Sequence, residues 1–327
     1  MERELLARTG VTFTAIPAAG VHGVGLRRLP GNLVQLARGY RASRRVLRDF
    51  RPHVLFFTGG YVAGPMGMAA GGRTPIALYV PDIEPGLALK FLARMATRIF
   101  VTVEETRAFF PKKEVQVVGY PVRKEILAWT RDKARQTLNL PQDAPVLLVF
   151  GGSLGARSIN QALLTALPRL LPHMYVVHIS GSRDWPMVEE RLTQLAAPLR
   201  ERYRPYPYLH ETMGAALAAA DLVVSRAGAS TLGEFPAWGL PAILVPYPHA
   251  WRYQKVNAMY LVARGAAVLL PDEALPRRLA DTVLALMQDA PRRQAMGQAM
   301  RALFRPQAAE EMARGLLALA QEGGRTP

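Results

Sequence analysis

The sequence contains no cysteine among its 327 residues. Disulfide bonds and thiolate metal sites are therefore excluded, and a cytosolic protein is compatible with this composition. The chain also lacks any run of about 20 apolar residues free of charge, so no membrane-spanning helix is predicted. Its first ten residues, MERELLARTG, are charged and have no apolar signal core.

Acidic residues are scarce relative to basic ones. The sequence has 25 Asp and Glu residues and 41 Lys and Arg residues, which gives a net charge of +16. Residues 1–140 hold 22 basic and 10 acidic residues, and the remainder holds 19 and 15. A basic first half indicates an anionic partner such as nucleic acid, anionic lipid or a phosphorylated substrate, although an arginine-rich proteome would give the same excess. The basic residues do not interleave with aromatic ones, so no nucleic-acid partner is predicted. The six histidines show no paired spacing for a metal site.

Apolar strand-like runs alternate with helical stretches along the whole chain. Continuous apolar strands separated by helices are typical of parallel sheets that are covered on both faces. Two sets of such runs predict an α/β protein with two doubly wound domains, in line with the length. The runs are VTFTAIPA, HVLFFTGG, PIALYVPD, RIFVTVEE and VQVVGYPV in the first half, and PVLLVFGG, MYVVHISG, DLVVSRAG, PAILVPYP and AAVLLPD in the second.

The domain boundaries follow from this alternation. We expect a first Rossmann-like domain over residues 1–126, a polar linker over 127–144, a second Rossmann-like domain over 145–300 and a C-terminal helix over 301–327. No Gly-rich turn precedes the run VTFTAIPA, whereas a doubly wound domain normally opens with a strand and such a turn. The first domain is therefore expected to lack its first βα unit.

The stretch SRAGASTLGE, residues 225–234, follows the apolar run DLVV. Small residues let a ligand approach the backbone, and a helix that starts there points free N–H groups at it. The carboxylate of Glu234 can accept paired hydrogen bonds from the hydroxyls of a ribose. Equally, Ala and Gly can pack a helix closely on a sheet, with Glu234 offsetting the helix dipole. The stretch alone leaves both interpretations open.

A Gly-rich turn lies between a strand and a helix in LLVFGGSLGARSINQAL. Gly151, Gly152 and Gly155 permit a tight turn with exposed N–H groups, and Ser153 adds a hydroxyl. Such a turn can bind a phosphate or diphosphate. It is not a Walker loop, because no Gly-Lys-Ser/Thr follows, and its spacing does not fit a dinucleotide fingerprint.

Three other loops carry groups suited to an anionic sugar ligand. A second Gly-rich turn, residues 57–70, would hold a diphosphate-bearing ligand or simply join a strand to a helix. Arg123, near the domain junction, can neutralise a diphosphate or lie solvated. Gln254 and Asn257 can pair with sugar hydroxyls or serve as ordinary surface polar groups.

Five motifs in this order resemble those of one family: TGGYVAGP, VVGYPVR, FGGSLGAR, SRAGASTLGE and YQKVNA. The resemblance covers nearly the whole chain and is to the MurG family, transferases that add N-acetylglucosamine to the lipid-linked muramoyl-pentapeptide precursor of bacterial cell wall. It implies the GT-B architecture, in which two Rossmann-like domains enclose a cleft and the sugar nucleotide binds the C-terminal domain. It also implies an inverting hexosyltransferase in peptidoglycan biosynthesis, with UDP-N-acetylglucosamine as donor, no cofactor and no obligatory metal ion.

The resemblance assigns donor-binding residues. Glu234 would accept the hydroxyls of the uridine ribose, and Gln254, beside Tyr253, would bind the sugar hydroxyls. The other implied donor-side residues are Arg123 at the hinge, Ser153 at the diphosphate or uracil, His210 near the uracil, and Ala229, Ser230, Thr231, Leu232 and Gly233 along the diphosphate and ribose.

The acceptor side is implied less directly. A polyprenyl-diphosphate-linked acceptor would approach Gly59, Gly60, Tyr61 and Asp82. Where the family often carries His-Glu-Gln-Asn, this chain reads YVPDIEPG, with Asp82 at the Asn position. The family's first Gly-rich loop, with the His that is its favoured catalytic base, has no counterpart here, so no catalytic residue is assigned. The alternatives are an inactive or truncated UDP-sugar-binding module, or a related UDP-sugar transferase with another lipid acceptor.

Residues 86–100, GLALKFLARMATRIF, suggest a membrane-facing helix. Leu87, Phe91, Met95 and Ile99 repeat every four residues, and a row of cations accompanies them. An apolar stripe flanked by cations is typical of a helix at an anionic membrane surface, although such a stripe more often packs on a sheet. With the basic first half, it predicts a cytoplasmic protein that is peripheral on the inner face of the cell membrane. The cations are Lys90, Arg94 and Arg98.

Overall fold

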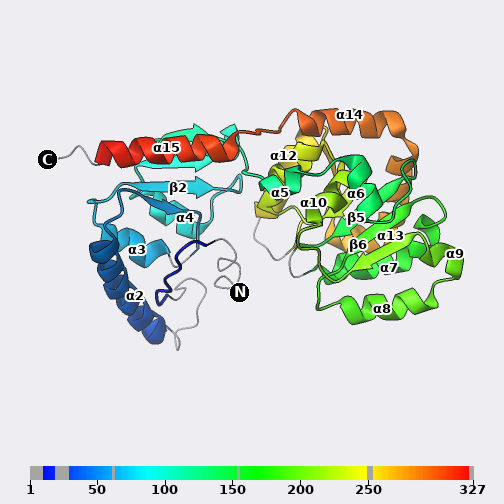
Figure 1. Ribbon diagram of the computed structural model, residues 1–327, viewed down its shortest axis with the longest axis horizontal. Helices are drawn as coiled ribbons and strands as arrows, with labels where there is room; N and C mark the ends of the chain where they lie inside the picture. Colours follow the sequence, from blue (N-terminus) through cyan, green and yellow to red (C-terminus); the bar gives the residue numbers. More distant parts are fainter. Residues whose placement is uncertain (1–9, 19–28, 61–62, 153–154, 249–252, 324–327) are drawn as a thin grey trace.

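The computed structural model describes residues 10–18, 29–60, 63–152, 155–248 and 253–323. These residues form two lobes, each built around one parallel β-sheet with helices on both faces (Figure 1). Two such α/β lobes are the GT-B architecture predicted from the sequence. Two of the predicted site residues, Tyr61 and Ser153, lie outside the described residues.

The sheet of the first lobe has four parallel strands in the order β1-β2-β3-β4. Its residues alternate between two faces, because successive side chains of a strand point in opposite directions. One face packs against the helices of the first half of the chain through residues such as Leu78 and Ile99. The strands and helices are β1 (Leu55–Phe57), β2 (Ile76–Val80), β3 (Arg98–Val101), β4 (Glu114–Val117), α2 (Leu29–Phe50), α3 (Ala63–Ala70), α4 (Leu87–Ala93) and the 3-10 helix η1 (Glu104–Phe109).

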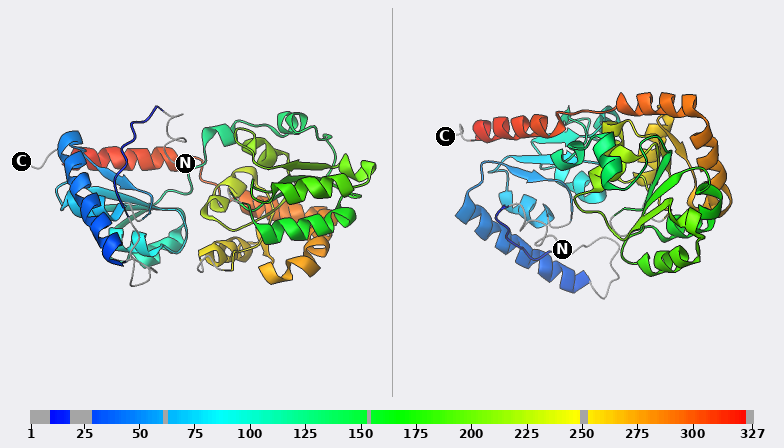
Figure 2. Two further views of the ribbon diagram at one scale, coloured as in Figure 1. Left: turned by 90° about the horizontal axis from the view of Figure 1, so that it is seen from below. Right: turned by 45° about the vertical axis from the view of Figure 1, so that its right-hand side comes forward.

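The other face of this sheet is covered by the last helix of the chain, α15 (Ala308–Gly323). Figures 1 and 2 show α15 returning from the second lobe to lie along the first. Its Met312 and Leu319 join Phe100 in one buried cluster. A side-chain carbon at Gly315 would lie 2.6 Å from the Phe100 ring, so glycine is what allows this close approach.

Two expectations for the first half are wrong. Residues 11–18 form no strand, although the apolar run VTFTAIPA was expected to be one. A strand needs a ladder partner, and β1 pairs with β2 alone. Residues 86–100 do not form one helix, because α4 ends at Ala93 and Thr97 N then bonds to Ile76 O at the start of β3. Ile99 is fully buried in that strand, so its place in the four-residue repeat is coincidental.

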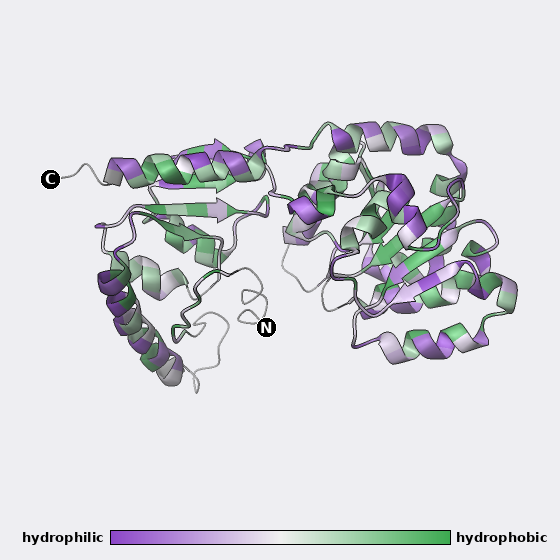
Figure 3. Ribbon diagram, in the orientation of Figure 1, coloured by the Kyte–Doolittle hydropathy of each residue, from purple (hydrophilic) through white to green (hydrophobic). Residues whose placement is uncertain are grey.

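The sheet of the second lobe has six parallel strands in the order β10-β9-β8-β5-β6-β7. Strand β5 is buried at every position, with Leu147 and Val149 packing on one face and Leu148 on the other. Figure 3 shows hydrophobic residues concentrated in such central strands. The strands are β5 (Val146–Phe150), β6 (Tyr175–Ile179), β7 (Tyr203–Tyr206), β8 (Leu222–Ser225), β9 (Ala242–Leu244) and β10 (Ala267–Leu269).

Helices cover both faces of this sheet, as the sequence predicted. Helix α7 packs on α13 on one face, and α6 packs on α10 on the other. The helices are α5 (Lys124–Leu127), α6 (Arg131–Thr137), α7 (Arg157–Leu170), α8 (Trp185–Gln194), α9 (Ala197–Arg200), α10 (Met213–Ala219), α11 (Glu234–Trp238), α12 (Tyr253–Ala263), α13 (Leu275–Gln288) and α14 (Ala290–Arg301), with the 3-10 helices η2 (Ala229–Leu232) and η3 (Asp272–Ala274).

Strand β7 was missed in the sequence analysis. It reads YRPY, and its Pro205 cannot donate a backbone hydrogen bond to a ladder. The strand tolerates this proline because β7 is at the edge of the sheet, where it pairs with β6 alone.

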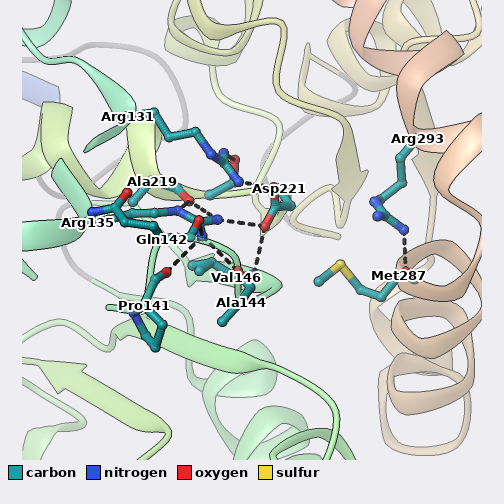
Figure 4. A network of polar contacts seen from close by, with 11 residues as sticks. Arg131, Arg135, Pro141, Gln142, Ala144, Val146, Ala219, Asp221, Met287 and Arg293 are labelled. Carbon is teal, nitrogen blue, oxygen red and sulfur yellow. Dashed lines mark hydrogen bonds and ion pairs between the residues drawn. The ribbon is translucent and has the colours of Figure 1, made fainter. Parts of the chain in front are cut away.

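The segment 127–144, expected to be a linker, carries α6 and packs into the second lobe through Ala134 and Leu138. Its Arg135 is fully buried. The guanidinium donates to the carbonyl oxygens of Pro141, Gln142, Ala144 and Ala219 and pairs with the Asp221 carboxylate (Figure 4). One side chain thus ties α6 to the loop before β5 and to the start of β8.

A second buried polar network supports Ser180, whose backbone lies against Gly155 of the Gly-rich turn after β5. Asn160 Nδ2 donates to Ser180 O at 2.8 Å and to Asp184 Oδ2 at 2.9 Å, so its Oδ1 is an acceptor. His178 Nε2 lies 3.0 Å from that Oδ1 and Nδ1 lies 2.7 Å from the Tyr203 hydroxyl. The ring therefore donates through Nε2 and accepts at Nδ1, as a neutral imidazole does. Burial lowers the pKa of His178 from 6.5 to about 3.

Among the described residues, no helix combines the length and the apolar composition that crossing a membrane requires.

Candidate functional site

A pocket of about 400 Å³ opens where strands β5, β6 and β8 end in the second lobe. It lies at the point where the strand order reverses, between β5 and β8. Ligands of open α/β sheets bind at this position because two neighbouring loops diverge there. Five residues proposed from the sequence line it together, namely Arg123, Gly152, His210, Ser230 and Glu234.

The Gly-rich turn after β5 forms one wall of the pocket. Gly152 has a φ of +101° and faces open space, so its backbone is accessible to a ligand. Gly155 has a φ of +77°, and a side-chain carbon there would lie 2.1 Å from Ser180 O. The turn is therefore pressed against the backbone that Asn160 and His178 hold in place. Gly151 packs against Ala156 at the start of α7.

Glu234 begins α11 on the opposite wall, and its carboxyl group is partly buried. Burial raises the pKa of Glu234 above its usual value, while the Arg123 charge and a hydrogen bond from Ser230 oppose that rise. A carboxylate that is short of solvent is a strong acceptor for hydroxyl groups that enter the pocket. Arg123 is exposed and supplies positive charge on the same pocket.

The rest of the stretch 229–233 is divided between the pocket and the core. Ala229 and Ser230 are partly exposed, whereas Thr231 and Leu232 are buried and turn their side chains into the protein. Gly233 lies against Tyr120, since a side-chain carbon there would be 2.6 Å from the Tyr120 Cβ. The expected single helix is split into η2 and α11, and of residues 229–233 Ser230 lines the pocket.

Helix α12 carries the predicted sugar-binding residues and packs against η2, whose Ser230 lines the pocket. Gln254 Oε1 accepts from Tyr247 N at 2.9 Å, which orients this amide on the loop after β9. The Tyr253 hydroxyl lies close to Gly86 of the first lobe. Asn257, one turn later, is buried and binds Asp82 and Ile83 of the first lobe. The sequence analysis gave Asn257 a sugar or surface role and missed this contact between lobes.

The acceptor-side residues that are described lie on strand ends of the first sheet. Gly59 and Gly60 follow β1 with φ values of +119° and +83°, and Asp82 follows β2. The carboxyl ends of parallel strands meet at one edge of a sheet, so these residues share the edge that contacts α12. Burial raises the pKa of Asp82, and its hydrogen bond from Asn257 opposes the rise.

Several pocket residues were not predicted. Tyr208, Leu209 and Met213 lie after β7, the strand hidden by Pro205, so nothing marked their loop as a strand end. Glu125 and Ile126 directly follow Arg123, and their proximity to it was the available signal. The remaining unpredicted residues are Phe150, Ile179 and Glu211. The described residues include no group of three or more His, Cys, Asp or Glu suited to a metal ion.

Comparison with known proteins agrees with this geometry. The sequence matches the Glycosyltransferase family 28 N-terminal domain over residues 1–101 and the C-terminal domain of that family over residues 146–312. A relative from Roseiflexus sp. (strain RS-1) is 40% identical over 357 residues, which cover 96% of this chain and 80% of the relative. That protein is a UDP-N-acetylglucosamine--N-acetylmuramyl-(pentapeptide) pyrophosphoryl-undecaprenol N-acetylglucosamine transferase. This chain belongs to the MurG family.

Other members support the assignment to the MurG family. The relative of the same name from Desulforudis audaxviator (strain MP104C) is 41% identical over 338 residues, covering 99% of this chain and 89% of its own. The crystal structure of Acinetobacter baumannii MurG matches with a TM-score of 0.73 and 26% identity, over 97% of this chain and 88% of that one. The MurG resemblance inferred from five loops is therefore confirmed.

Proposed function

We propose that this chain transfers N-acetylglucosamine from UDP-N-acetylglucosamine to the N-acetylmuramyl-(pentapeptide) pyrophosphoryl-undecaprenol acceptor named in its relatives. The observation that carries the proposal is the pocket that gathers Arg123, Gly152 and Glu234 at the switch point of the second sheet. The transfer would invert the configuration at the anomeric carbon, because an acceptor hydroxyl displaces UDP in one step. Negative charge that grows on the departing diphosphate has to be stabilised.

The pocket offers a group for each part of the donor. The backbone at Gly152 and the Arg123 guanidinium would bind the diphosphate, without a metal ion. Glu234 would accept both ribose hydroxyls. Tyr208 and Met213 supply aromatic and apolar surface for the uracil near His210. Gln254, which lies on α12 outside the lining of this pocket, would bind the sugar hydroxyls.

The direct test is an assay of UDP release with UDP-N-acetylglucosamine and a lipid-linked muramoyl-pentapeptide. UDP release that depends on this acceptor supports the proposal. Donor binding without release would instead support a binding module, and release only with another lipid acceptor, such as diacylglycerol, would support a related transferase.

Substitution of Glu234 by Ala is expected to weaken UDP binding by about 1–3 kcal/mol, the range for hydrogen bonds to a charged group. This corresponds to a roughly 5- to 150-fold rise in Kd, measured by calorimetry. Because burial raises the pKa of Glu234 and ribose hydroxyls favour its ionised form, UDP affinity should also rise with pH until Glu234 is ionised. The control is Glu189→Ala, an exposed carboxylate on α8, which should leave the Kd unchanged. An unaltered Kd in Glu234→Ala would remove the ribose assignment.

We also propose that the first lobe docks on an anionic membrane surface, where a polyprenyl-linked acceptor would be found. Helix α2 fits this role better than residues 86–100, in which Arg98 pairs with Glu114 at 2.7 Å. Five arginines of α2 are exposed, against one acidic residue in that helix, and Leu33 and Val34 are each more than half exposed. Helix α2 packs on α3, and α3 packs on α4, so the three helices form one layer on this face of the sheet. In α4 the Phe91 side chain is 41% exposed. Figure 3 shows hydrophilic residues along much of α2.

The variant Arg38→Gln, Arg41→Gln, Arg45→Gln is expected to bind vesicles that contain anionic phospholipid about 100-fold more weakly than the parent at low salt. Each cation near such a surface contributes about 1 kcal/mol. The measurement is co-sedimentation, with purely neutral vesicles as a background. The matched control changes Arg277, Arg278 and Arg292 of the second lobe to Gln, and should sediment like the parent. Equal sedimentation of both triple variants would exclude α2 as the docking surface.

A further inference from the structure

The Gly-rich turn after β5 rests on the backbone that follows β6. Gly155 approaches Ser180 so closely that a side-chain carbon there would lie 2.1 Å from the Ser180 carbonyl oxygen. Gly155 N donates to Gly152 O at 3.0 Å, and Gly152 lines the donor pocket. The position of the Ser180 carbonyl therefore helps to fix where the backbone of Gly152 lies in the pocket.

The Ser180 carbonyl is held by one fully buried side chain of α7. Asn160 donates through Nδ2 to Ser180 O at 2.8 Å and to Asp184 Oδ2 at 2.9 Å. Both N–H groups of the amide are thereby used, and its Oδ1 can only accept. If the amide turned over, its oxygen would face two other acceptors, and the Ser180 carbonyl would lose this donor.

His178 determines which way the amide of Asn160 points. Its Nε2 lies 3.0 Å from Asn160 Oδ1, and its Nδ1 lies 2.7 Å from the Tyr203 hydroxyl. A neutral imidazole has a single N–H group, and this group has to be at Nε2 because Asn160 Oδ1 accepts. All three side chains are at most 2% exposed, so water does not replace these hydrogen bonds. Each bond of this buried series orients the next.

We infer that His178 is a positioning residue for the donor diphosphate, and that it acts through Asn160 and the Ser180 carbonyl on the Gly-rich turn. The inference rests on the proposed function, in which the backbone at Gly152 binds the diphosphate. A binding group is effective only when hydrogen bonds behind it hold it in place. Loss of the Nε2 donor should therefore weaken the contacts to the diphosphate and spare those to the uridine.

The test compares two substitutions of His178. In His178→Gln the side-chain amide nitrogen can take the place of Nε2 and donate to Asn160 Oδ1, whereas His178→Leu has no donor. Calorimetry measures the Kd for UDP, and ligand-observed NMR measures the Kd for uridine. In His178→Leu we expect the Kd for UDP to rise about tenfold, and that for uridine less than about twofold. In His178→Gln both values should stay within about threefold of the parent's.

Two further variants separate positioning from a general loss of stability. Arg135→Ala removes a buried network at the other ends of β5 and β8, and should leave the ratio of the two Kd values unchanged. Asn160→Ala should reproduce the effect of His178→Leu, and it tests the same series of contacts if His178→Leu does not fold. Combining the two should raise the Kd for UDP no further, because His178 acts through Asn160. All variants are measured where circular dichroism shows them folded.

The outcomes distinguish this inference from the proposed function. Equal losses of UDP and uridine affinity in His178→Leu and Asn160→Ala would overturn the positioning role and leave the proposed function intact. An unchanged Kd for UDP in both variants would do the same. A parent that does not bind UDP would overturn the proposed function, and the positioning role with it.

Discussion

Replacement of Arg135 by Ala is expected to lower the free energy of unfolding by about 3–5 kcal/mol, the range for breaking a buried ion pair on one side. Arg135 is fully buried, and its Nη1 donates to Pro141 O at 2.9 Å and to Ala144 O at 2.8 Å. Its Nη2 lies 3.0 Å from Asp221 Oδ2. Removing the guanidinium would leave these carbonyl groups without hydrogen-bond donors (Figure 4). It would also leave the Asp221 carboxylate with one ion-pair partner fewer.

Chemical denaturation monitored by far-UV circular dichroism measures this loss. Arg131→Ala is the matched control, because Arg131 binds the other oxygen of Asp221 with its side chain 45% exposed. Exposed ion pairs contribute about 0–1 kcal/mol, so this variant should unfold close to the parent. Arg135→Lys should not restore stability, since an ammonium cannot reach carbonyls on several sides as a planar guanidinium does. A loss below about 1 kcal/mol in Arg135→Ala would show that α6 is held by apolar packing alone.

Acidification should destabilise the second lobe through His178. The pKa of His178 in the folded protein is about 3, below the usual value of 6.5. Between these pH values the unfolded chain therefore binds a proton at this histidine that the folded chain does not. The contribution of neutral His178 to the free energy of unfolding is therefore fully present above pH 6.5. It is lost as the pH falls towards 3, at about 1.4 kcal/mol per pH unit. Across that window the loss amounts to about 4–5 kcal/mol.

The measurement is denaturation at a series of pH values for the parent and for His178→Gln. The variant should have a lower free energy of unfolding than the parent at neutral pH. Below pH 6.5 its free energy of unfolding should depend less steeply on pH, because the amide of Gln does not titrate. The raised pKa values of Asp82 and Glu234 act in the opposite direction on acidification, so the difference between parent and variant isolates His178. The exposed His173 is the control, and His173→Gln should keep the parent's slope. Parallel curves for parent and His178→Gln would contradict a neutral buried imidazole.

Much of the candidate site could be predicted because its signals are local. The turn at Gly151–Gly155 and the stretch that ends at Glu234 each follow an apolar strand directly. Parallel strands of one sheet bring their carboxyl ends to one edge, so the two loops meet without any further information. Loops whose strand was not recognised were missed for the same reason, as Tyr208 after β7 shows.

Residues whose role depends on a partner far along the chain could not be predicted. Asn257 reads as one more polar residue of a helix, yet it is buried and joins Asp82 to Ala227. Residues 86–100 read as one amphipathic helix, but the hydrogen bond from Thr97 N to Ile76 O ends it. In both cases a partner far along the chain decides the outcome.

By itself the sequence determined the two α/β domains, the membership of the MurG family and the loops that form the donor pocket, because strand hydrophobicity and glycine-rich turns act over a few neighbouring residues. The tertiary structure alone decided which charges are buried and which are open to solvent. It made Arg135 a fully enclosed link between α6 and β8, left the arginines of α2 exposed, and set the Asp82 carboxylate beside the donor lobe. The physical reason is that desolvation and pairing depend on what surrounds a charge in space, and adjacent residues in the chain do not specify those surroundings.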